Sequence, residues 1–148
     1  MVNAGLHTFV DKRRVRDAIL RAEETAAAPI SVAVVPHVLG DVHAAALRAL
    51  HRRGLSRAPE RNAVHFFVVP SRREFAVVGD AGAHERLGQE AWDSVAATVE
   101  KHFRLGDPTA GLVAGIEDVG RLLARHFSED RDQGAIGTPG AGGLSAVR

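Results

Sequence analysis

The chain has 148 residues, a length that forms one domain and can bury its own core. Hydrophobic residues make up 45% and charged residues 25%, as in an ordinary soluble globular protein, and a formal net charge of +1 creates no field that would favour nucleic acid. The absence of cysteine excludes disulfides, thiolate metal sites and cysteine nucleophiles.

The first half of the chain alternates helical and strand patterns. Residues 11–25 predict a helix, because an aspartate stands at the N-cap position and apolar residues recur at helical spacing. Residues 30–35 form a short β-branched run between prolines, which is typical of a strand buried on both faces. Residues 41–53 predict a second helix, which starts at an aspartate and ends before a glycine.

Two apolar runs follow, separated by a short basic turn. Residues 63–70 and 75–79 predict the second and third strands. The helix between the first two strands predicts a right-handed parallel crossover for that pair. The basic turn, residues 71–74, is so short that the third strand must run antiparallel to the second.

The second half of the chain predicts two helices and a tail. Residues 89–104 carry one apolar stripe, and a proline at residue 108 marks the start of the last helix. Residues 128–148 are rich in glycine and small residues and predict a disordered tail. Four amphipathic helices can cover both faces of the strands, so residues 1–127 predict one α/β domain. We expect a three-layer α/β/α sandwich on a small mixed β-sheet, with a parallel crossover and an antiparallel hairpin.

The first candidate site lies where the second strand begins and the third ends. Arg61 and Asn62 precede the second strand, and Asp80 follows the third between glycines. Calcium prefers several oxygen ligands in a flexible loop, so Asp80 is a predicted metal ligand. The alternatives are that Arg61 pairs with Asp80 or holds an anion, or that glycines shape the turn and Asp80 caps it. The predicted binding residues are Arg61, Asn62, Gly79, Gly82, His84 and Arg86.

The second candidate site follows the first strand, at the strand end where open α/β sheets bind ligands. His37, Asp41 and His43 offer two imidazoles and a carboxylate, which could hold zinc or another divalent metal. We expect the basic turn at the same end of the sheet, opposite the first candidate site. The alternative, which we favour because the spacing matches no strong motif, is that Asp41 caps a helix and both histidines are solvated.

The order of these motifs resembles the TPM domain family, named for thylakoid, photosystem-repair and acetylcholine-receptor-modulator members. The similarity rests on the entry to the second strand at residues 61–64, on the hairpin PSRREFAVVGDAG, and on the later segments FRLGD and GLVAGI. It covers residues 9–127 and implies a free-standing soluble member. The family usually has Ser-Gly-Glu before the first strand, where this chain has Ala-Ala-Pro at residues 27–29.

The resemblance implies calcium binding and acid phosphatase activity for some members, and a binding or assembly role for others. We predict a binding or assembly module for protein partners, tuned by a divalent cation such as calcium, with no nucleic-acid ligand. The alternative is a metal-dependent phosphatase-like hydrolase, which would need two or three convergent acidic or histidine ligands. No apolar run could span a bilayer or serve as a signal peptide, so we expect a cytoplasmic protein.

Overall fold

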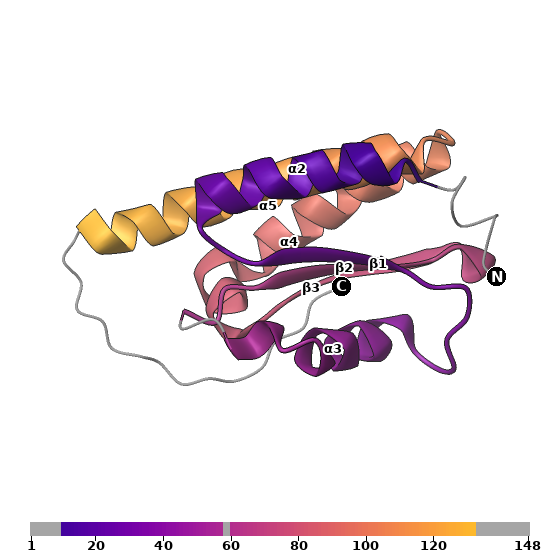
Figure 1. Ribbon diagram of the computed structural model, residues 1–148, viewed down its shortest axis with the longest axis horizontal. Helices are drawn as coiled ribbons and strands as arrows, with labels where there is room; N and C mark the ends of the chain where they lie inside the picture. The colour runs from indigo at the N-terminus through magenta and orange to yellow at the C-terminus, as the bar shows by residue number, and fades with distance from the viewer. Residues whose placement is uncertain (1–9, 58–59, 133–148) are drawn as a thin grey trace.

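A computed structural model describes residues 10–57 and 60–132, and the structural statements below refer to these residues. The chain folds into three layers, with α3 on one face of the sheet and α2, α4 and α5 on the other (Figure 1). This confirms the predicted α/β architecture. In chain order the elements are α2 (Lys12–Ala26), β1 (Ile30–Val34), α3 (Val42–Arg52), η1 (Leu55–Arg57), β2 (Val64–Val69), η2 (Pro70–Arg72), β3 (Glu74–Gly79), α4 (Ala81–Arg104) and α5 (Pro108–Asp132).

The described residues form one three-stranded sheet in the order β1-β2-β3. β1 runs parallel to β2, because α3 carries the chain back across the sheet between them. β2 and β3 are antiparallel, with Val64 opposite Gly79 at one end and Val69 opposite Glu74 at the other. All six residues of β2 are buried, since this central strand is covered on both faces.

Two hydrophobic cores lie on the two faces of the sheet. Neighbouring residues of β2 point to opposite faces, so Phe66 joins Trp92 and Leu112 under α4 and α5, whereas Phe67 joins Leu50 under α3. Each fully buried side chain of this size stabilises the fold by about 1.5–3 kcal/mol. The two cores therefore hold β2 and β3 from both faces. They also fix the positions of the residues that directly precede and follow these strands.

Two helix boundaries differ from the sequence prediction. α4 begins at Ala81, where Asp80 caps a short helical segment that the sequence did not predict; the backbone is non-helical at Gly88 (φ 81°, ψ 162°), and the predicted helix of residues 89–104 follows this kink. Residues for which no helix was predicted, such as His84, therefore lie on a helix. α5 continues to Asp132, so residues 128–132 of the predicted tail are helical, and the rest of that tail lies outside the described residues. Within the described ranges, no helix combines the length and the apolarity that a membrane crossing requires.

Candidate functional site

Arg61 and Asp80 form a bidentate ion pair at the end of the sheet where β2 begins. Arg61 Nε donates to Asp80 Oδ2 over 2.6 Å, and Arg61 Nη2 donates to Asp80 Oδ1 over 2.8 Å. The Asp80 side chain is only 2% exposed, whereas that of Arg61 is 43% exposed. The hydrogen bond to Asp80 raises the pKa of the Arg61 guanidinium. The ion pair that the sequence offered as an alternative is thus present.

The backbone around this pair ties the start of β2 to the start of α4. Asp80 caps α4 by accepting a hydrogen bond from the Ala81 amide, and its own amide donates to the Ala63 carbonyl. Arg61 has a left-handed backbone (φ 53°), and its carbonyl accepts from the Ala83 amide over 3.0 Å. Both Asp80 oxygens are engaged by Arg61 and the side chain is 2% exposed, so a cation would compete with the guanidinium for this carboxylate. Metal ligation by Asp80 stays a prediction.

The two glycines of this region allow close packing. A Cβ added to Gly82 would lie 2.0 Å from the Glu60 carbonyl oxygen and 2.8 Å from that of Arg61. A Cβ added to Gly79 would lie 2.6 Å from the Trp92 ring. Only glycine lets these segments approach so closely. Gly79 and Gly82 therefore shape this end of the sheet, whatever else they contact.

The other predicted binding residues, Asn62, His84 and Arg86, have different environments. The buried Asn62 amide donates to the Ala27 carbonyl and to a Glu60 carboxylate oxygen, at 3.4 and 3.3 Å. His84 lies on the first turns of α4, and its buried Nδ1 has no hydrogen-bond partner among the described residues. Arg86 is exposed on the same helix. Of these residues, the structure joins Arg61 to Asp80 directly, and Asn62 holds the chain that enters β1 and β2.

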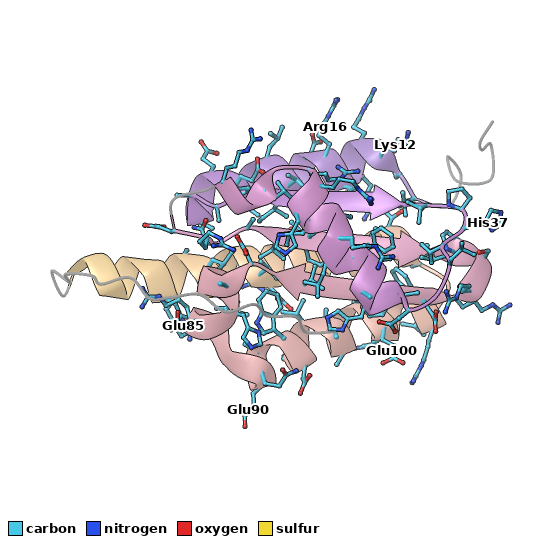
Figure 2. All side chains as sticks on the ribbon, turned by 90° about the horizontal axis from the view of Figure 1, so that it is seen from below. Lys12, Arg16, His37, Glu85, Glu90 and Glu100 are labelled. Carbon is cyan, nitrogen blue, oxygen red and sulfur yellow. The ribbon has the colours of Figure 1, made fainter. Side chains whose placement is uncertain are left out.

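The second candidate site lies at the opposite end of the sheet. Figure 2 shows His37 at this end, while Glu85 and Glu90 point outward from the start of α4 at the other. Asp41 caps α3 through a hydrogen bond from the Ala44 amide to Oδ2. The structure does not join His37, Asp41 and His43: among the described residues, no three His, Cys, Asp or Glu side chains lie close enough to hold a metal ion.

The basic turn does lie at this end, as predicted. Ser71 Oγ donates to the Pro36 carbonyl over 2.7 Å, and Arg72 Nη1 donates to the Gly40 carbonyl over 2.5 Å. These two bonds fix the turn between β2 and β3 against the loop that leads into α3. The pairing of these segments creates a continuous surface from the start of α3 to the start of β3.

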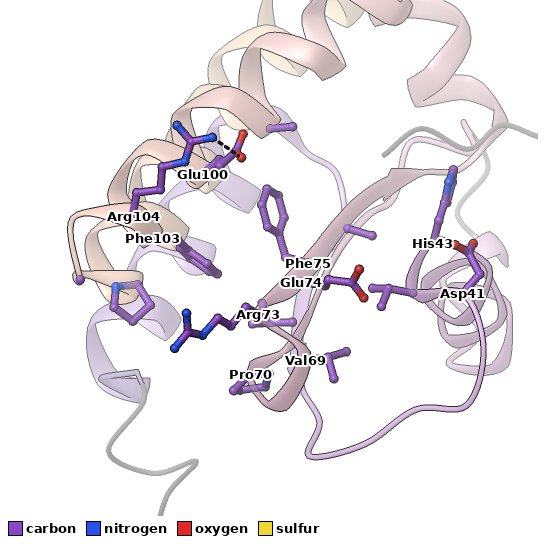
Figure 3. A pocket seen from close by; sticks show the side chains of 16 residues that line it. Asp41, His43, Val69, Pro70, Arg73, Glu74, Phe75, Glu100, Phe103 and Arg104 are labelled. Carbon is purple, nitrogen blue, oxygen red and sulfur yellow. Dashed lines mark hydrogen bonds and ion pairs between the residues drawn. The ribbon is translucent and has the colours of Figure 1, made fainter.

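A groove that sequence analysis did not find opens beside this surface. It has a volume of about 1200 Å³ and lies between the start of α3, the start of β3 and the end of α4 (Figure 3). We call it the β3 groove. Phe75 and Phe103, which look like core residues in the sequence, contact each other in its wall at a ring-centroid distance of 5.4 Å. The residues that line it and bear on its chemistry are Asp41, His43, Arg73, Phe75, Glu100 and Phe103.

Comparison with known proteins agrees with the motifs. A sequence profile of the TPM domain family matches residues 2–122. The chain belongs to the TPM domain family. The NMR structure of the BA42 protein from Bizionia argentinensis matches 85% of this chain and 88% of its own, with 26% identity and a TM-score of 0.76. The N-terminal domain of cg2496 from Corynebacterium glutamicum, at 17% identity, shares the fold with a TM-score of 0.60, over 74% of this chain and 68% of its own. No curated protein matches the sequence.

This TPM domain also buries a histidine in its central strand. His65 is fully buried, and its Nδ1 shares a 2.5 Å hydrogen bond with the Ser31 hydroxyl. Burial lowers the pKa of His65 to about 4, helped by the positive charge of Arg53 and opposed by Ser31. His65 Nε2 has no partner among the described residues, so nothing there compensates a proton on the ring. His65 is therefore a neutral packing residue at pH 7.

We expect the free energy of unfolding to fall by about 2 kcal/mol between pH 7 and pH 5 because of His65. Unfolded His65 binds a proton near pH 6.5, whereas the folded residue does so only near pH 4. The unfolded state therefore binds more protons as the pH falls through this range, which lowers stability. Urea denaturation of the wild type and His65→Leu at both pH values measures the effect. An equal loss in both proteins would contradict it.

Proposed function

We propose that this TPM domain is a binding module for a partner protein, and that the partner contacts the β3 groove. The size of the groove carries the proposal, because about 1200 Å³ exceeds the roughly 300–1,000 Å³ of small-molecule pockets and leaves room for a segment of a partner protein. Two exposed leucines flank it. Leu39 is 92% exposed and precedes the start of α3, and Leu105 is 72% exposed at the end of α4.

The opposite end of the sheet supports a binding role rather than hydrolysis. A carboxylate that holds a metal or activates water needs free lone pairs directed at the ligand. Asp80 directs both oxygens at Arg61 and caps α4 as well. This carboxylate is therefore used to position the chain. The alternative, a metal-dependent phosphatase-like hydrolase, is suggested by the family resemblance alone.

Site-specific photo-cross-linking tests the proposal. We expect a photo-reactive phenylalanine analogue at Leu105, beside the groove, to give a discrete heavier adduct in cells. The same analogue at Glu90, exposed near the start of α4, serves as the matched control and should give none. Equal labelling at both positions, or none at Leu105, would overturn the proposal. Metal-dependent hydrolysis of p-nitrophenyl phosphate that disappears in Asp80→Asn would support the hydrolase instead.

A further inference from the structure

In the described part of the chain, the start of β3 presents unpaired backbone groups to the β3 groove. β3 is an edge strand, and Phe75 stands opposite Val68 on β2. The Val68 carbonyl turns toward β1, where it accepts from the Val35 amide over 2.9 Å. In an antiparallel pair such a residue and its opposite partner both point their backbone groups away from each other. The amide and carbonyl of Phe75 therefore face the open edge.

The groove extends over both faces of this edge. On one side of β3, Phe75 packs against Phe103 of α4. On the other side, Glu74 and Ala76 face the start of α3, where His43 also lines the groove (Figure 3). Successive side chains of a strand point to alternate faces, so a strand added beside Phe75 would place alternate side chains in the two halves. Val77 is fully buried, which limits such an addition to the beginning of β3.

Two acidic side chains of the groove are ion-paired and a third caps a helix, which leaves one cation without a partner among the described residues. Glu100 pairs with Arg104, and Glu74 pairs with Arg72, each at 2.9 Å. Asp41 is used in capping α3. The exposed side chain of Arg73 has no hydrogen-bond or ion-pair partner in the described part of the chain, and its left-handed backbone (φ 54°) ends the basic turn directly before β3. A carboxylate is the complementary group for this guanidinium.

We propose that the β3 groove binds an extended, acidic segment of a partner protein, which adds to β3 as a further strand. The segment hydrogen-bonds to the backbone of Phe75 and directs a carboxylate toward Arg73, while its alternate side chains enter the α3 side of the groove. Main-chain bonding of this kind supplies affinity, and the alternating side chains supply selectivity. The inference rests on the proposed function and specifies the partner's chemistry.

NMR titration of the full chain with blocked hexapeptides tests this inference. The probe Thr-Glu-Val-Glu-Val-Thr carries both acids on one face of a strand. We expect saturable shifts centred on the Phe75 amide, and at least tenfold weaker binding when lysine replaces both glutamates or proline replaces the central valine. Arg73→Glu should weaken binding of the acidic peptide at least tenfold. Arg57→Glu, at an exposed arginine of η1, should change the affinity for this peptide less than twofold.

Three outcomes would overturn strand addition. They are equal binding of the acidic and basic peptides, full binding of the proline peptide, and an unshifted Phe75 amide at saturation. Analytical ultracentrifugation could show dimers that form with rising concentration and that Arg73→Glu abolishes. This result would overturn the acidic partner and identify a second copy of the chain as the occupant of the groove. Cross-linking at Leu105 without any peptide discrimination would leave the binding module standing and overturn only its acidic, extended partner.

Discussion

Gly82→Ala is expected to destabilise the domain by about 3 kcal/mol, the largest effect we predict for a single methyl group. The added Cβ would lie 2.0 Å from the Glu60 carbonyl oxygen, and this backbone atom belongs to the segment that leads into β2. The clash can be relieved only if the Glu60–Arg61 segment moves, which would break the hydrogen bond from the Ala83 amide to the Arg61 carbonyl. The better helix propensity of alanine offsets about 1 kcal/mol or less of this loss. Urea denaturation measures the loss.

Gly115→Ala is the matched control for Gly82→Ala. Both glycines lie in helices, so both substitutions gain similar helix propensity. The nearest atom to an added Cβ at Gly115 is a methyl carbon of Val99, at 2.6 Å, and a side chain can rotate or shift where a backbone carbonyl cannot. We expect a smaller loss at Gly115. Equal losses would show that the Glu60–Arg61 backbone does not hold α4 in place.

Arg61→Ala is expected to lower the free energy of unfolding by about 2 kcal/mol, because it leaves a buried carboxylate without its partner. The loss is less than for a fully buried pair, since the half-exposed Arg61 site admits water to Asp80. Asp80→Asn in the same protein removes the charge and keeps a capping side chain. The double variant should therefore be more stable than Arg61→Ala alone. Urea denaturation of the four proteins gives the coupling energy.

Arg104→Ala provides the comparison for this pair. Arg104 pairs with Glu100 one turn earlier on α4, with both side chains more than half exposed. Such exposed pairs contribute only about 0.5 kcal/mol. If Arg61→Ala costs no more than Arg104→Ala, the Arg61–Asp80 pair does not tie β2 to α4. A double variant no more stable than Arg61→Ala would mean that the lost packing of Arg61, not the unpaired charge, causes the loss.

The pair and the groove differ in how far sequence could predict them. Arg61 and Asp80 flank two adjacent antiparallel strands, so the hairpin itself predicts that they meet, and the ion pair was one of the stated possibilities. The groove needs Phe75 and Phe103 in contact, although most of α4 lies between them in sequence. Their apolar side chains look like core residues, because periodicity shows that a residue is buried but not against which element.

Local sequence determined the three strands, the four helices, their order and the hairpin, because apolar periodicity, caps and turn length act between near neighbours. It missed the short helical segment that begins at Ala81, whereas the glycine at residue 88 does mark a break, since its backbone is non-helical and the predicted helix of residues 89–104 follows it. Tertiary structure alone decided that both Asp80 oxygens face Arg61. It also decided that, among the described residues, His65 Nε2 is buried without a partner and Arg73 stands unpaired beside an open strand edge. These features depend on distances between elements, and such distances are set by how the two cores pack against the sheet.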